Sequence, residues 1–125
     1  NIEWQKRSVL MLSGLWEAVK KYPSSFGNWA VLGQRLCAGT SEIAVSGQFF
    51  QQELAELLRF YTPNKVIQAG IDEEMPLLRG KNDSPENVYI YVCRQYQCLK
   101  PVKTAKEAIE LLKFNGAKDI FTIIE

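Results

Sequence analysis

The sequence contains no histidine. Histidine is the usual general base near neutral pH and the commonest metal ligand in proteins. A Ser-His-Asp triad, a Cys-His pair or a His-zinc centre contained within this chain is therefore excluded.

Cysteine is also scarce, with three residues in all: Cys37, Cys93 and Cys98. Small secreted domains carry dense, even sets of cysteines, whereas an odd set in a chain of 125 residues is typical of a reducing compartment. We therefore predict a cytoplasmic protein that folds by burying apolar side chains.

The chain has no excess of either charge and no long apolar run. Fifteen Lys and Arg residues face fourteen Asp and Glu residues, for a formal net charge of +1. No field of one sign draws in nucleic acid or an anionic membrane. The apolar runs fall far short of the roughly 20 residues that a bilayer span needs, and no signal segment opens the chain. We expect a soluble protein with no nucleic-acid or membrane partner.

The first part of the chain has helical periodicity. Apolar residues recur every three or four positions from Trp4 to Lys20, which predicts a helix that ends before Pro23. Ser24 and Ser25 are suited to cap a second helix, and Gly39 to end it. Because residue 1 already lies in helical sequence and is not Met, we expect the chain to be part of a larger protein that continues upstream.

A strand, a helix and a second strand follow. Glu42–Ser46 favours a strand, the stretch from Phe50 to Tyr61 is an amphipathic helix that stops before Pro63, and Lys65–Ala69 is another apolar run. Such a unit has parallel strands joined by a right-handed crossover.

The rest of the chain alternates again between loop, strand and helix. The stretch Asp72–Asn87 is a long connection with one helical turn at Glu74–Leu78, and Val88–Cys93 is a strand. Thr104 and Glu107 form a capping-box pattern at the start of a helix. Gly116 is placed to end that helix, and Asp119–Ile124 is a final strand.

The predicted fold class is therefore α/β. We expect three layers, with a small, mainly parallel sheet of four strands flanked by helices and the first strand in its interior. A two-helix hairpin over residues 1–38 precedes the α/β domain of residues 39–125.

Ligands of parallel sheets bind outside the carboxyl ends of the strands, where loops and helix N-termini converge. Side chains at those predicted ends are candidates for a ligand site, although ordinary turn residues explain them as well. The candidates are Ser46, Gly47, Gly70, Asp72, Cys93 and Arg94.

Cys93 and Cys98 are candidates for a redox pair or for half of a metal site. Their spacing differs from the Cys-x-x-Cys of thioredoxin-like chemistry, and three cysteines without histidine cannot complete a structural zinc site. Structural or packing thiols remain the simpler alternative. The acids suggest no glycosidic pair, since Glu53 and Glu56 are expected on a solvated helix face.

Several segments, in this order and spacing, resemble the C-terminal region of the YyaL-like family, which includes spermatogenesis-associated protein 20. The resemblance covers residues 40–113. The segments are Tyr61–Ile67, Pro76–Lys81, Tyr91–Cys93 with Cys98, Pro101–Val102 and Glu110–Leu112.

The resemblance implies a parent protein with an N-terminal thioredoxin-like domain and a central barrel of paired helices, similar to sugar-modifying enzymes. The first two helices here would then be the last hairpin of that barrel. Thioredoxin-type cysteines would lie in the absent domain, so no active-site residue carries over.

Together these features predict a non-catalytic accessory domain with no metal and no cofactor, not an enzyme on its own. Its partner would be the remainder of its own parent chain, and exposed helix faces could form a homodimer. The alternative is a small-ligand or thiol-redox domain that uses the strand ends and the Cys93–Cys98 pair.

Overall fold

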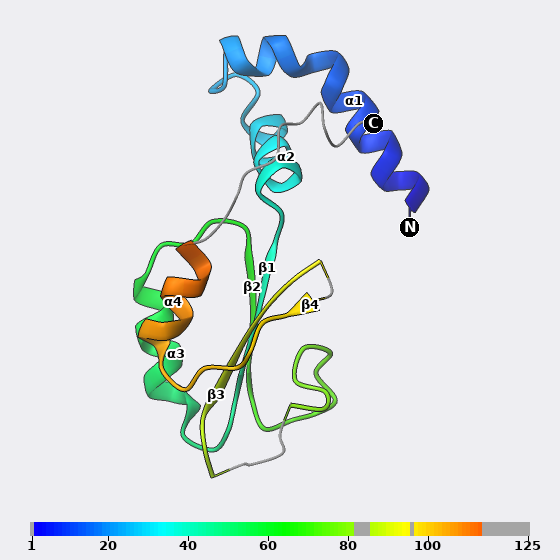
Figure 1. The fold of residues 1–125 in the computed structure, drawn as a ribbon. Coiled ribbons are helices and arrows are strands. Elements are labelled where there is room, and N and C mark those ends of the chain that lie inside the picture. Colours follow the sequence, from blue (N-terminus) through cyan, green and yellow to red (C-terminus); the bar gives the residue numbers. More distant parts are fainter. Residues whose placement is uncertain (1, 82–85, 96, 114–125) are drawn as a thin grey trace. The chain divides into compact units, whose positions relative to one another are not determined.

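The computed structural model describes residues 2–81, 86–95 and 97–113 (Figure 1). The described residues divide into two compact units, one that ends at Gly39 and one that begins at Thr40.

The first unit is a pair of packed helices, α1 (Ile2–Lys21) and α2 (Gly27–Ala38). Leu12 and Val19 of α1 are buried. Their apolar surroundings are Leu15, Trp16, Phe26, Trp29, Ala30, Leu32, Leu36 and Cys37. The predicted hairpin is present because the apolar stripes of the two helices cover each other.

The prediction for α2 was wrong at the N-terminus of the helix and correct at its C-terminus. Phe26 occupies the N-cap position without a side-chain hydrogen bond, so the prediction that Ser24 or Ser25 caps this helix was wrong. Gly39 follows the last turn with a φ of 71°, and its N–H donates to the Arg35 carbonyl. A positive φ costs glycine little, which confirms the predicted stop.

The second unit contains four strands and two helices. They are β1 (Ser41–Ser46), α3 (Phe50–Arg59), β2 (Lys65–Gly70), β3 (Tyr89–Arg94), β4 (Gln97–Cys98) and α4 (Ala105–Lys113). The strand order is β2-β1-β3-β4, so β1 is interior as predicted. The β1-α3-β2 segment also has the expected parallel strands.

The sheet is mixed, and the prediction of a mainly parallel sheet was wrong. β3 runs antiparallel to β1, and β4 runs antiparallel to β3. A parallel strand needs a crossover connection, usually a helix. The described part of the connection after β2 contains turns and no helix, so β3 starts at the end of the sheet where β1 and β2 finish.

The fourth strand differs from the predicted one. β4 follows a tight turn at Gln95, whose φ is 51°. The predicted final strand Asp119–Ile124 and the predicted stop at Gly116 lie outside the described residues.

Both helices of this unit lie on one face of the sheet (Figure 1). The core on that face contains side chains of α3, α4 and the two central strands. Its buried members are Ile43, Val45, Leu57, Ile90, Val92, Ala105, Ala108 and Leu112.

The opposite face has no helix among the described residues of this unit, contrary to the expected three layers. Alternate residues point to opposite faces of a strand, so Ala44, Gln68 and Tyr91 lie on this side. The loop after β2 covers it with Leu78, which is fully buried. The helical turn predicted at Glu74–Leu78 is replaced by hydrogen-bonded turns.

Candidate functional site

The direction of β3 separates the residues predicted to form one ligand site. Ser46 pairs with Tyr89, at the start of β3, and with Gly70 of β2. Arg94 pairs with Ser41, at the other end of β1. Five residue steps of about 3.3 Å put the two ends about 17 Å apart. Ser46, Gly47, Gly70 and Asp72 thus belong to one end of the sheet, and Cys93 and Arg94 to the other.

Ser46 and Gly47 serve the packing of the sheet edge. The Ser46 side chain is buried, and its Oγ donates to the Tyr89 carbonyl at 3.4 Å. Gly47 has a φ of 119°, and a Cβ there would overlap the carbonyl oxygen of Asn87. Glycine is therefore required because a neighbouring backbone lies against it.

Gly70 and Asp72 begin the loop that covers the helix-free face. Gly70 has a φ of 145°, and Asp72 Oδ1 accepts the Glu74 N–H at 2.9 Å. This Asx-type turn is a local backbone device. The loop is fixed to β2 by the Leu77 N–H, which donates to Gln68 Oε1 at 2.7 Å.

Arg94 is bound to the end of α4. Its Nη2 donates to the carbonyls of Leu111 at 3.1 Å and Leu112 at 3.2 Å, and its Nε donates to Ser41 Oγ at 3.3 Å. A guanidinium at a helix C-terminus satisfies unpaired carbonyls and complements the helix dipole. The side chain links the last turn of α4 to β1 and β3.

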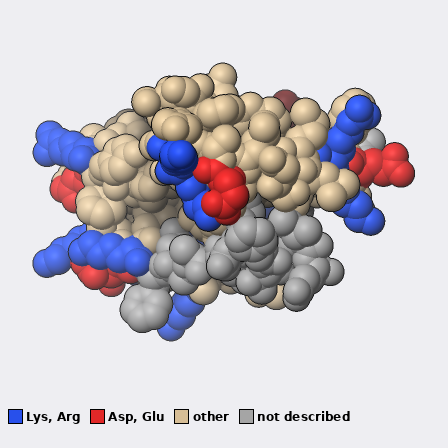
Figure 2. Space-filling model, turned by 90° about the horizontal axis from the view of Figure 1, so that it is seen from above, with Lys and Arg blue, Asp and Glu red and all other residues tan. Residues whose placement is uncertain are grey.

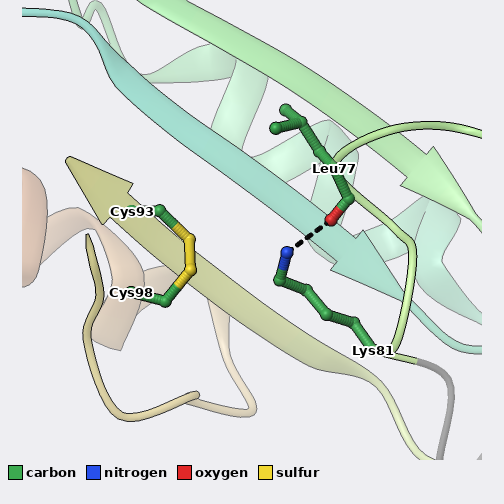
Figure 3. The surroundings of a disulfide bond; sticks show 4 residues. All are labelled: Leu77, Lys81, Cys93 and Cys98. Atoms are coloured by element: carbon green, nitrogen blue, oxygen red, sulfur yellow. Dashed lines mark hydrogen bonds between the residues drawn. A yellow bond between two sulfur atoms is a disulfide. The ribbon is translucent and has the colours of Figure 1, made fainter. Parts of the chain in front are cut away.

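Cys93 and Cys98 form a disulfide that joins β3 to β4 (Figure 3). The two residues are direct partners in the antiparallel register, and their Cα atoms are 3.9 Å apart. The structural or packing thiols that were the simpler alternative from the sequence are therefore replaced by a disulfide in the structure. The missed signal was the turn at Gln95, which folds the chain back and aligns the two cysteines.

The two sulfur-bearing residues differ in accessibility. Cys93 is 3% exposed, whereas Cys98 lies in an exposed strand. The disulfide lies on the helix-free side of the sheet, on the same side as Tyr91. Near it, Lys81 Nζ donates to the Leu77 carbonyl at 2.7 Å (Figure 3). The same nitrogen lies 5.6 Å from the Tyr91 ring centroid.

Three side chains accept hydrogen bonds from backbone N–H groups at the N-terminus of α4. The predicted capping box is present, since Thr104 Oγ1 accepts the Glu107 N–H and Glu107 Oε2 accepts the Thr104 N–H. Hydrogen bonds from the Thr104 hydroxyl, then from the Lys103 and Thr104 backbone, hold the pKa of Glu107 below its ordinary value.

Glu53 is the third of these side chains. It reaches across from α3, and its carboxylate accepts the Ala105 N–H. The prediction that Glu53 lies on a solvated face with Glu56 was therefore wrong for Glu53, which is half-buried, and correct for Glu56.

A pocket of about 590 Å³ lies between helix α4 and the segment that follows β4. It is open to solvent and mostly apolar, with two lysines and one acid in its wall. The lining residues are Leu99, Lys100, Pro101, Val102, Lys103, Glu107 and Leu111. Glu107 is already engaged by the capping box, so this pocket has no converging set of acid and base groups.

Among the described residues on the face drawn in Figure 2, charge gives no further indication of a site. On the face drawn in Figure 2, basic and acidic side chains lie in small neighbouring groups, and neither sign forms a continuous patch. Within the described ranges, no three Cys, Asp or Glu side chains are arranged to hold a metal ion. None of the helices in that part of the chain combines the length and apolar content of a membrane span.

In comparisons with known proteins, no family model, no curated protein and no solved structure matches the chain.

Proposed function

We propose that the chain is a non-catalytic accessory domain that binds a larger helical partner through apolar helix surface. The observation that supports this most directly is the use of the candidate polar groups. Ser46, Asp72 and Arg94 each make hydrogen bonds that stabilise a strand edge, a turn or a helix end.

The first unit carries the surface for such a partner. Trp4 is 67% exposed and Met11 is 52% exposed. The two residues are seven positions apart and so lie on one side of α1. Large apolar side chains gathered on a surface are typical of protein contacts.

The resemblance to the YyaL-like family supplies the kind of partner. In that family the preceding part of the chain is a barrel of paired helices, and helices of the first unit would continue that arrangement. The proposed partner is therefore the remainder of the chain's own parent protein.

The test compares the longer protein with the same protein lacking this segment, and adds the separately purified 125-residue chain back. We expect the shortened protein to have a lower solubility and a lower melting temperature than the longer protein, and to bind the added chain. The double variant Trp4→Ser/Met11→Ser should weaken binding at least tenfold, because it removes apolar contact area.

Leu99→Ser, which changes an exposed apolar residue of the second unit, is the matched control and should bind normally. Unchanged solubility and melting temperature, together with no binding in trans, would refute an accessory role.

Thiol exchange is a second candidate function, favoured by the Cys93–Cys98 disulfide and the exposure of Cys98. In this reaction the reduced pair would form one disulfide while a substrate disulfide becomes two thiols. A persistent disulfide is typical of oxidising compartments, whereas in the proposed cytoplasmic setting this bond would form and break.

The exchange reaction is tested by equilibrating the chain in dithiothreitol buffers of graded potential and counting thiols by alkylation and mass spectrometry. A redox role predicts catalysed reduction of a model disulfide such as insulin, and its loss in Cys98→Ser. A disulfide that turns over no substrate would leave the bond a purely structural one.

A further inference from the structure

A carboxylate lies beside the disulfide in the sheet. Glu42 of β1 is the direct partner of Cys93 in the antiparallel register, and Cys93 is the direct partner of Cys98. Opposing residues of neighbouring strands point to the same face, with Cβ atoms about 5 Å apart. Ile43 and Val45 belong to the core on the helix side, so Glu42 lies with both cysteines on the helix-free side. The three side chains therefore form one row across β1, β3 and β4.

The fold does not account for the position of the Glu42 carboxylate. Glu42 is half-buried, and its register neighbour on the other side is apolar Val66. Within the part of the chain that the structure describes, no hydrogen bond or ion pair engages this carboxylate. A carboxylate withdrawn from water without a partner is unfavourable, and such groups concentrate at functional sites. A chemical role at the neighbouring cysteine would explain why an acid stands here.

The other charged and titratable groups near this row are not suited to accept a proton. Lys81 Nζ lies over the ring of Tyr91, which is two positions before Cys93 on the same side of β3. Lys100 follows Cys98 by two positions. A lysine ammonium and a neutral phenol hold their protons, whereas an ionised carboxylate has only acceptor sites.

The cysteines stay aligned with Glu42 when the disulfide is open. The Leu99 N–H donates to the Val92 carbonyl at 2.9 Å, directly after β4. The backbones of Ile90 and Val102 exchange two hydrogen bonds of 2.8 and 3.0 Å further along. These bonds do not depend on the sulfur atoms, so they keep the two strands in register in the reduced chain.

We infer that Glu42 is the proton acceptor of Cys93, an assignment that rests on the thiol exchange proposed above. Exposed Cys98 attacks a substrate disulfide, keeps one half in a mixed disulfide and releases the other half as a thiolate. Cys93 is 3% exposed, so solvent has little access to its proton. Glu42 takes that proton, the Cys93 thiolate attacks Cys98 Sγ, and the second half leaves as a thiolate. The cysteine pair loses two electrons, the substrate disulfide gains them, and the proton passes from Glu42 to solvent.

The reaction of the reduced chain with dithiobis(nitrobenzoate) separates the two steps. In a Cys37→Ser background only the pair reacts, and each step releases one coloured nitrothiobenzoate. The first release measures the attack by Cys98, and the second measures closure by Cys93, so Cys93→Ser should give the first release alone. Near neutral pH, Glu42→Gln should slow the second release at least tenfold and leave the first unchanged, because a positioned base contributes about 10²- to 10⁴-fold.

The pH profile of the second release distinguishes a proton acceptor from a structural residue. With Glu42 present the rate should be nearly flat between about pH 6 and 7.5, because a carboxylate is ionised throughout this range. In Glu42→Gln the rate should rise about tenfold per pH unit and reach that of the parent above about pH 9, where a thiol ionises without a base. Glu42→Asp should keep the flat profile. Glu56→Gln, which changes an exposed carboxylate of α3, is the matched control and should behave as the parent does.

Three results would overturn the assignment. The first is an equal or faster second release in Glu42→Gln, because a carboxylate that acted only through its charge would disfavour the neighbouring thiolate. The second is a uniform slowing at every pH, which would indicate lost alignment of the strands. The third is a tenfold rise per pH unit in the parent chain itself, which needs no variant to fold. Insulin reduction is measured separately, because its absence would refute thiol exchange as a function while the release rates still decide the role of Glu42.

Discussion

Removing the Cys93–Cys98 disulfide tests whether β4 depends on this covalent link. The residues are five positions apart, so the bond closes a short loop. In the chain-entropy account a loop of this size contributes about 2 kcal/mol to the free energy of unfolding. We expect Cys98→Ser to lose about that much, since Cys98 is exposed and its hydroxyl replacement creates no buried polar group.

The assay is urea unfolding followed by far-UV circular dichroism, with and without reductant. With an m-value of about 2 kcal/mol per molar urea, the midpoint should fall by about 1 M. Reductant should lower the wild-type midpoint by the same amount and leave Cys98→Ser unchanged. The strand pairing should survive, because the Ile90 and Val102 backbones exchange two hydrogen bonds of 2.8 and 3.0 Å.

Cys37→Ser is the control, because it removes the remaining cysteine and should keep the full response to reductant. A wild-type midpoint that does not respond to reductant, equal to that of Cys98→Ser, would refute the reasoning.

Substitutions at Gly47, Glu53 and Glu107 probe the contacts that stabilise the second unit, and Gly14→Ala and Glu56→Ala are the controls for the first two. Gly47→Ala should cost about 2 kcal/mol or more, because its Cβ would overlap the Asn87 carbonyl at a φ of 119°, whereas Gly14→Ala, where a Cβ meets nothing, should be neutral or stabilising in chemical denaturation. Glu53→Ala should cost about 1 kcal/mol by leaving the Ala105 N–H without its carboxylate acceptor, and exposed Glu56→Ala should change unfolding by less than about 0.5 kcal/mol. The lowered pKa of Glu107 means that its ionised form stabilises the fold above the ordinary carboxyl pKa, and that this contribution is lost as the pH falls below about 4. Glu107→Gln should flatten the stability profile between pH 6 and 3, and an unchanged profile would contradict the capping role.

Local signals in the sequence predicted local structure well. Thr104 and Glu107 predicted the start of α4, and Gly39 predicted the end of α2, because capping depends on residues within one turn. The sequence also predicted the β1-α3-β2 unit correctly, because a helix between two apolar runs is typical of a crossover between parallel strands.

Local sequence signals do not predict the direction of β3. It depends on whether the connection after β2 crosses the sheet, and the turns that cover the helix-free face have no strong periodicity. The prediction of the candidate site was wrong for the same reason, because parallel strands would have placed Arg94 and Ser46 at the same end of the sheet. Glu53 was missed for a similar reason, since its partner Ala105 is 52 positions away along the chain.

Strand direction is the point on which the account depends, and nuclear Overhauser contacts between β1 and β3 measure it directly. Antiparallel strands give strong contacts between opposing Hα atoms at alternate pairs, so we expect them within the register that runs from Ser41 opposite Arg94 to Ser46 opposite Tyr89. Contacts that instead place Ser46 beside Arg94 would show that β1 and β3 are parallel. The candidate residues would then lie at one end of the sheet, which would contradict the conclusion that their polar groups stabilise the fold and form no common site.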